Sequence, residues 1–200
     1  MWRGAISRDP ACPLLDNHST LDRYTAALSV AVGACAVASA VTLGVFFAVG
    51  GKFGTLNDVL NGLLAVLSGY LAWRLSGRTV FVYVALLGEV IAVIGSILVI
   101  FNVTGFFLAG LVSSLGFALI GLWLLTYCWS LEASSLRWLG LAAGALMVIG
   151  IAVIPGIVLR LDDMSKAPPW IWVGFVSWLG IYVAYPAWAI WSGLANQSAR

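Results

Sequence analysis

Glu89 is the only charged residue in the longest apolar stretch of the chain, residues 79–130. If that stretch crosses a membrane, its carboxyl group must face the interior of a helix bundle. An acid at mid-bilayer costs at least about 2.5–3.5 kcal/mol even on lenient insertion scales. A functional Glu89 would couple proton movement or orient a ligand. The structural alternative is a neutral hydrogen bond between helices, worth about 0.6 kcal/mol on average. The candidate partners on other helices are Ser68, Tyr70, Ser113, Ser114, Ser177 and Tyr182.

A second group of polar residues is predicted at or near the outer ends of the helices. Its members are Asn57, Asp58, Asn61, Asn102, Asp162 and Asp163. Carboxylate and amide oxygens are ligands for a hard cation, and they also hydrogen-bond polar headgroups. Four of the six have a structural explanation, and Asn61, one turn inside the second helix, is the best single candidate. Asp58 fits a capping box with Thr55, Asn102 suits a turn, and the two remaining acids solvate a loop.

Four aromatic residues of the last apolar stretch share one helical face. They are Phe175, Trp178, Tyr182 and Tyr185, at spacings of three, four and three residues. Such a stripe would stack against a quinone, a carotenoid or another flat lipid. The alternative is a packed core face whose tyrosine hydroxyls are hydrogen-bonded.

No catalytic or cofactor-binding motif accompanies these candidates. The chain has one histidine, His18, and three cysteines without metal-ligand spacing. It contains no phosphate-binding loop, nucleophile elbow or metalloprotease motif. We therefore predict no catalytic residue, no metal and no cofactor, and the protein is not expected to be an enzyme.

The composition places these residues in a membrane. Of the 200 residues, 62% are hydrophobic and only 9% are charged, whereas soluble domains have about 25% charged residues. The net charge of +2 provides no basic patch for nucleic acid. A soluble domain and a nucleic-acid partner are both excluded.

Six apolar stretches are long enough to cross the hydrocarbon core, which takes about 20 residues. They predict helices at about 24–50, 55–75, 79–101, 105–129, 138–159 and 169–191. The fold class is all-α, a polytopic six-helix transmembrane bundle with short loops. Residues 24–193 form its single domain, between an N-terminal segment, 1–23, and a tail, 194–200.

Basic residues predict the orientation of the bundle. With six spans both termini lie on one side, together with seven Lys and Arg residues, against three on the other side. Because cytoplasmic loops are enriched in basic residues, both termini are expected in the cytoplasm.

Three segments carry a resemblance to other proteins: residues 53–75 (FGTLNDVLNGLLAVLSGYLAWRL), residues 105–125 (GFFLAGLVSSLGFALIGLWLL) and residues 162–191, which contain DDM and PPWIWVGFVSWLGIYVAYPAWAIW. Together they resemble small bacterial six-span integral membrane proteins to which no function is attached. The resemblance implies the span count and a bacterial cell membrane, and it transfers no role to any residue.

Three functions remain as hypotheses. The first is a non-enzymatic membrane protein that binds lipid or another hydrophobic ligand, or acts as an accessory subunit. Its partners would be membrane lipid, other membrane subunits or a second copy of the chain. The second is a small proton-linked transporter or channel that uses Glu89. The third is a membrane-embedded enzyme that acts at the outer face.

Overall fold

The computed structural model describes residues 14–198, with side chains described for residues 23–195. This part of the chain is helical and contains no strand. The elements are α1 (Leu14–Val49), α2 (Phe53–Ser76), α3 (Val80–Ile100), α4 (Phe106–Trp129), α5 (Ser135–Val148), η1 (Ile149–Val153), α6 (Ile154–Val158), η2 (Met164–Lys166), α7 (Ile171–Leu179), η3 (Gly180–Ala184) and α8 (Tyr185–Ser198).

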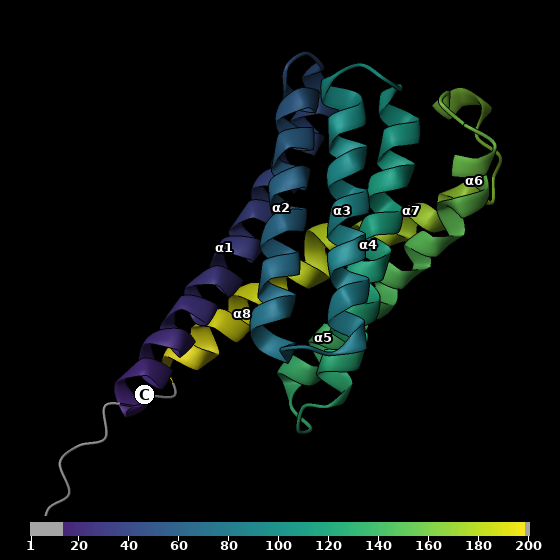
Figure 1. Cartoon of the computed structure of the whole chain (residues 1–200). Coiled ribbons are helices and arrows are strands. Elements are labelled where there is room, and N and C mark those ends of the chain that lie inside the picture. Colours follow the sequence, from purple (N-terminus) through teal and green to yellow (C-terminus); the bar gives the residue numbers. More distant parts are fainter. Residues whose placement is uncertain (1–13, 199–200) are drawn as a thin grey trace, which may run out of the picture.

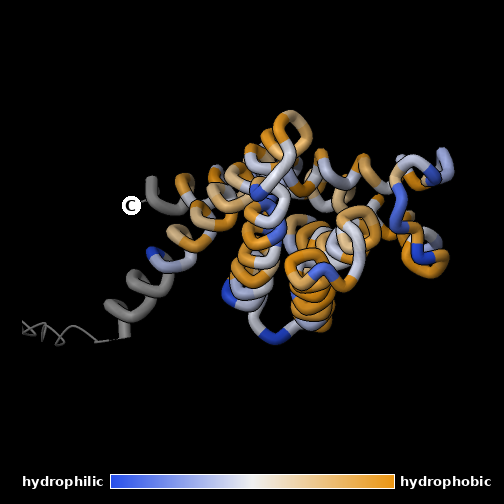
Figure 2. The backbone as a smooth tube through the Cα atoms, turned by 90° about the horizontal axis from the view of Figure 1, so that it is seen from above, coloured by the Kyte–Doolittle hydropathy of each residue, from blue (hydrophilic) through white to orange (hydrophobic). Residues whose placement is uncertain are grey.

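Six helices of the described chain are long and apolar enough to cross a membrane, which confirms the predicted six-helix fold class. They are Arg23–Val49, Phe53–Ser76, Val80–Ile100, Phe106–Trp129, Ser135–Val158 and Ile171–Ala195. The last two spans each join several elements, because short irregular turns interrupt them. Along the tube in Figure 2, hydrophobic residues mainly cover the helices and hydrophilic residues gather at the connections.

The first helix begins earlier than the sequence predicts. Helix α1 already starts at Leu14, within the segment 1–23 that was expected to precede the helices. Its 36 residues span about 54 Å at 1.5 Å per residue, well beyond the ~30 Å hydrocarbon core. The polar first turns of α1 therefore extend beyond the apolar part of the helix.

The helices form a ring in which consecutive spans are neighbours (Figure 1). Helices α2, α3 and α4 stand side by side, and α1 runs obliquely beside α8, so the first and last spans close the ring. Helix α4 also packs on α5 and contacts α7. The α1–α2, α3–α4 and α6–α7 connections share one end of the bundle, called here the upper end, as in Figure 1. The end of helix α8 and the α2–α3 and α4–α5 connections lie at the lower end.

Glycines bring the central helices into close contact. Gly88 of α3 faces the backbone carbonyl of Gly116 in α4, and a side chain at either position would strike the other helix. Gly144 of α5 similarly faces Gly121 of α4. Without a hydrophobic driving force between helices in lipid, such close packing is a main source of helix association. Around it lies a core with two large buried rings, Trp123 and Trp188.

Candidate functional site: a buried polar cavity

Asp58 is a buried acid inside helix α2. The helix begins at Phe53, and its N-cap residue, Lys52, makes no side-chain capping bond. The capping role expected for Asp58 is therefore wrong, because the helix starts two residues before Thr55 and Asp58 is already its sixth residue. Only 6% of Asp58 is exposed, and its Oδ2 atom is buried without a hydrogen-bond partner.

Two asparagines of the same helix lie beside Asp58 and bind two other spans. The Ser39 hydroxyl of α1 lies 2.9 Å from Asn57 Oδ1 and 2.8 Å from Asn61 Oδ1. The Tyr182 hydroxyl, from η3, donates a hydrogen bond of 3.1 Å to Asn61 Oδ1. Asn57 and Asn61 are one turn apart, so both face the same neighbours. The first, second and sixth spans therefore meet at these side chains.

The hydroxyl protons of Ser39 and Tyr182 are fewer than the side-chain oxygens of this group. Ser39 has a single hydroxyl proton, which satisfies only one of the two amide oxygens at a time. Tyr182 supplies one further proton, to Asn61. The buried Oδ2 of Asp58 receives none. The Oδ2 atom of Asp58 is therefore open to one further hydrogen bond.

A small cavity lies between these residues and helix α4. Its volume is about 20 Å³, which is room for the centre of one water molecule. It is lined by Leu43, Asn57, Asp58, Asn61, Phe106, Gly110, Ser113, Ser114, Phe117, Trp178, Ile181 and Tyr182. Asp58 and Tyr182 are the only ionisable groups in this lining. The cavity therefore has room for one water molecule, and in this conformation it has no space for a larger solute.

The sixth span reaches the cavity through a local irregularity. In η3, which is a π-helical turn, the Tyr185 N–H bonds to the Gly180 carbonyl five residues back. The next residue, Pro186, has no N–H, so the regular bond to the carbonyl of Tyr182 cannot form. The resulting π turn contains Ile181 and Tyr182, both of which line the cavity. π turns within helices are frequent at functional sites.

The other three members of the predicted polar group lie elsewhere at the upper end. Asn102 occupies the α3–α4 turn with φ of +53°. Asp162 accepts bonds from the Gly105 N–H (2.7 Å) and the Leu108 N–H (3.4 Å), so it caps α4 from the α6–α7 connection. The structure thus separates the six residues into the cavity trio of Asn57, Asp58 and Asn61 and a set that orders the connections.

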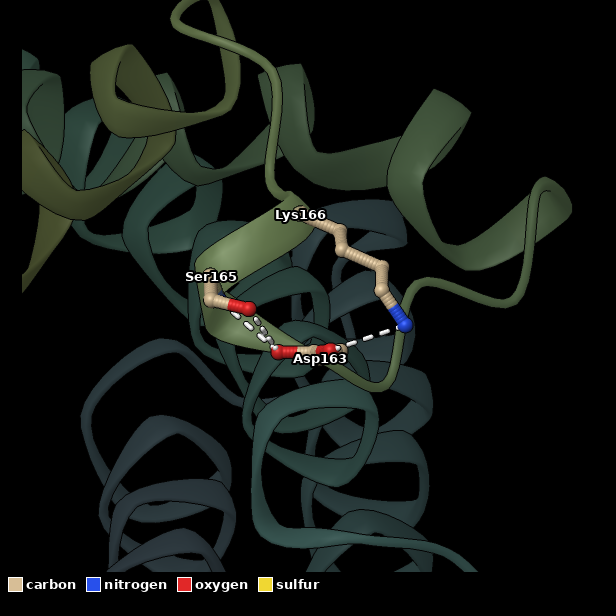
Figure 3. Close-up of polar contacts among 3 residues, drawn as sticks. All are labelled: Asp163, Ser165 and Lys166. Atoms are coloured by element: carbon tan, nitrogen blue, oxygen red, sulfur yellow. Dashed lines mark hydrogen bonds and ion pairs between the residues drawn. The ribbon is translucent and has the colours of Figure 1, made fainter.

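Asp163 stabilises its own turn (Figure 3). Its Oδ1 accepts hydrogen bonds from the Ser165 hydroxyl (2.7 Å) and the Ser165 N–H (2.9 Å), and its Oδ2 lies 3.1 Å from Lys166 Nζ. The hydrogen bonds from Ser165, followed by that from Lys166, lower the pKa of Asp163 to about 2. No group of three or more His, Cys, Asp or Glu residues in the described chain is placed to hold a metal ion.

The predicted aromatic stripe is divided between different environments. Trp178 donates a hydrogen bond of 3.2 Å to Ser114 and, with Tyr182, lines the cavity. Phe175 stacks on Phe107, with 5.9 Å between ring centroids. Tyr185 is fully buried and stacks on Trp188 at 6.0 Å. The rings of Phe175, Trp178 and Tyr182 contact one another in sequence, whereas the Tyr185 ring packs on Trp188.

Glu89 lies apart from the cavity. Its carboxyl group fills the space above Gly69 of α2, where a side chain would collide with it, and the residue is half-buried. Of the partners expected for Glu89, Ser114 pairs with Trp178 and Tyr182 pairs with Asn61.

Ser39 is the member of the site that sequence reasoning missed. It lies in an apolar helix rich in alanine and other small residues, and its neighbours give no sign of which face meets α2. Pro186 was the available signal for the irregular sixth span, because proline inside a helix removes a backbone bond.

No family model, curated protein or solved structure matches this chain. The fold and the site define this chain as a multi-pass membrane protein of six helices with a buried polar cavity near one end.

Proposed function

We propose that the protein is a small proton-linked transporter of the cell membrane, in which Asp58 takes up and releases the proton. The observation that carries this proposal is the Asp58 carboxyl group. Only 6% of Asp58 is exposed, its Oδ2 atom has no hydrogen-bond partner, and the residue lines a water-sized cavity. Intramembrane acids that face a cavity commonly mark proton or ion pathways.

The surroundings of Asp58 favour binding of a proton over pairing with a basic side chain. The only salt bridge found among the described residues joins Lys166 to Asp163, far from Asp58 in the chain. A buried carboxylate without a counter-charge neutralises itself by binding a proton. The hydroxyls of Ser39 and Tyr182 and one water molecule would then supply a short hydrogen-bonded route to the group.

The irregular turns in the fifth and sixth spans supply a means of opening the cavity. The 3₁₀ turn η1 in the fifth span packs against α7, and the π turn η3 in the sixth span packs against α5. Transporters commonly place broken helices at the site where substrate and coupling ion bind. Since the cavity is too small for a solute, the described conformation is a closed one. Transport would require the fifth and sixth spans to move apart from α4.

In this proposal both termini are cytoplasmic, so the Asp58 cavity lies near the outer face of a bacterial membrane. Seven of the ten basic residues would lie on the cytoplasmic side. The protein would act without covalent chemistry on its substrate and therefore not as an enzyme.

Proton flux into proteoliposomes tests the proposal. Vesicles with an imposed membrane potential and an internal pH dye would compare wild type with Asp58→Asn, Glu89→Gln and empty vesicles. We expect flux above the empty-vesicle rate for wild type and Glu89→Gln, and a loss to that rate for Asp58→Asn. The exposed Glu132→Gln variant is the matched control for removing a carboxylate. Equal flux in wild type and Asp58→Asn would overturn the role of Asp58.

A second candidate function, binding of a hydrophobic ligand, is favoured by a larger cavity at the lower end. Its volume is about 380 Å³, and its lining is Leu75, Ser76, Thr79, Phe81, Trp123, Thr126, Tyr127 and Ser130. This size is typical of small-ligand pockets, which are mainly apolar with a few polar groups. Native mass spectrometry of the purified protein tests it. A bound lipid that is lost in Thr126→Trp would support this function, and a ligand-free wild type would contradict it.

A further inference from the structure

Oxygen atoms from three spans converge at the Asp58 cavity. Ser39 Oγ of α1 lies 2.9 Å from Asn57 Oδ1 and 2.8 Å from Asn61 Oδ1, and the Tyr182 hydroxyl lies 3.1 Å from Asn61 Oδ1. The single proton of Ser39 reaches only one of the two amide oxygens at a time. The Oδ2 atom of Asp58 is buried and has no hydrogen-bond partner. Amide, hydroxyl and carboxylate oxygens therefore gather around one small space.

The charge and the size of the cavity suit a single monovalent cation. No Lys, Arg or His residue lines it, and a buried carboxylate without a counter-charge is costly. One proton or one monovalent cation would balance the charge of Asp58, whereas a divalent ion would leave a positive charge unbalanced. Mg²⁺ also keeps several of its waters, for which a cavity of about 20 Å³ has no space.

The π turn η3 adds backbone oxygens beside the cavity. The Tyr185 N–H bonds to the Gly180 carbonyl, and Pro186 has no N–H. The carbonyls of Ile181 and Tyr182 therefore do not receive the regular helix bonds from the residues four positions later. Ile181 and Tyr182 both line the cavity. In transporters with interrupted helices, backbone carbonyls of this kind coordinate Na⁺.

We infer that the Asp58 cavity is a binding site for Na⁺, which competes with the proton for the Asp58 carboxylate. The inference rests on the proposed function, because it assigns a second ion to the same site. One carboxylate with neutral amide, hydroxyl and carbonyl oxygens is a donor set for a hard cation. Na⁺ without its water shell is smaller than K⁺, so the size of the cavity favours Na⁺.

The competition is assigned to Asp58 because few other titratable groups face it. Among the elements packed on α2, η3 contributes Tyr182, which lines the cavity. The Cys35 thiol of α1 bonds to a backbone carbonyl of α2 over 3.4 Å. Glu89 of α3 contacts α2 at Gly69, about three turns beyond Asp58. Helix α4 carries no acidic or basic residue.

Binding of radiolabelled Na⁺ to the full chain in lipid nanodiscs tests the inference. We expect saturable binding by wild type, with an apparent Kd that rises about tenfold for each pH unit in the acidic range, because one proton displaces one ion. An excess of KCl should leave the label bound. Binding no higher than in empty nanodiscs would overturn the inference. So would a Kd that is independent of pH, or displacement of the label by KCl as efficient as by NaCl.

Two substitutions separate the charge of the site from its neutral oxygens. Asp58→Asn keeps the size of the side chain and removes its charge, so binding should fall to the level of empty nanodiscs. Ser39→Ala removes the group that holds both amide oxygens, and loss of such a partner should raise the Kd about tenfold or more. Glu132→Gln, at an exposed acid, is the matched control and should bind like wild type. Wild-type binding by Asp58→Asn, or an equal loss in Glu132→Gln, contradicts the inference.

An infrared measurement on the unsubstituted chain separates this inference from the proton proposal. Near the midpoint of the Asp58 titration, replacing choline chloride with NaCl should weaken the carbonyl band of the protonated carboxyl group. A band that persists in saturating NaCl would overturn the competition and leave the proton role of Asp58 intact. Conversely, Na⁺ binding that is lost in Asp58→Asn, with proton flux unchanged by that substitution, would support the Na⁺ site and overturn the proton transport role.

Discussion

The Tyr182 hydroxyl donates a hydrogen bond to Asn61 Oδ1 over 3.1 Å, and this bond joins the π turn of the sixth span to the second span. It places a residue of an irregular helix directly beside the buried Asp58 carboxyl group. The shape of the cavity therefore depends on the geometry of η3.

Removing this hydroxyl is expected to weaken the bundle. Tyr182→Phe should lower the free energy of unfolding by about 0.6–1.5 kcal/mol, because Asn61 loses one of its donors. Equilibrium unfolding in mixed micelles measures the change. Tyr70→Phe is the control, since Tyr70 is 51% exposed. Equal losses in the two variants would show that the bond to Asn61 contributes nothing specific.

Asp162 holds the start of α4 from a distant connection. Asp162→Ala is expected to cost about 1 kcal/mol, the usual value for loss of an N-terminal cap, without changing proton flux. Asp162→Asn keeps one acceptor and should retain most of the stability. The same unfolding measurement checks both. A loss of flux at unchanged stability in Asp162→Asn would contradict the purely structural role.

Asp163 makes a pH-dependent contribution to the stability of the protein at the α6–α7 connection. Its pKa is lowered to about 2, first by hydrogen bonds from Ser165, against about 3.9 in an unfolded chain. Its contribution to stability is therefore present above about pH 3.9 and is lost as the pH falls toward 2. Carbon-13 NMR of the Asp163 carboxyl group should give a midpoint near 2. Ser165→Ala should raise this midpoint. An unchanged midpoint would show that the hydrogen bonds from Ser165 do not lower the pKa of Asp163.

Most of the fold was predictable because membrane insertion leaves a strong signal. About 20 consecutive apolar residues have few alternatives to a spanning helix, so all six spans follow from the sequence. The ends of the helices were less predictable. Helix α2 begins at Phe53 rather than at Thr55, and this shift changes Asp58 from an expected cap into an interior residue.

The site was predictable only in part, because its members come from four spans. Asn57, Asp58 and Asn61 attracted attention as polar residues near the end of one apolar helix. Their partner Ser39 did not, since a serine in an alanine-rich helix is common on any face. Three of the predicted residues, Asn102, Asp162 and Asp163, lie at the same end of the bundle as the cavity trio but in the connections between helices. The position of a residue along a spanning helix gives its depth in the membrane directly. Its position around the bundle depends on how the helices pack.

Close packing of α3 and α4 makes Gly88 sensitive to substitution. A Cβ at Gly88 would meet the Gly116 carbonyl oxygen and lie 2.9 Å from Leu119 Cβ. Because a backbone oxygen cannot move aside, Gly88→Ala should destabilise the protein by about 1–3 kcal/mol. Gly44→Ala, where nothing lies within 4 Å, should be neutral or stabilising by up to about 1 kcal/mol. Unfolding in mixed micelles compares the two, and similar effects would contradict the packing explanation.

Protonation of Asp58 in the cavity is the central claim, and infrared difference spectroscopy of the protein in lipid measures it directly. Stepping the pH should change a carbonyl stretching band of a protonated carboxyl group in wild type and in Glu89→Gln. The same band should be missing from the difference spectrum of Asp58→Asn. If Asp58→Asn gave the same band as wild type, Asp58 would not be the group that binds the proton.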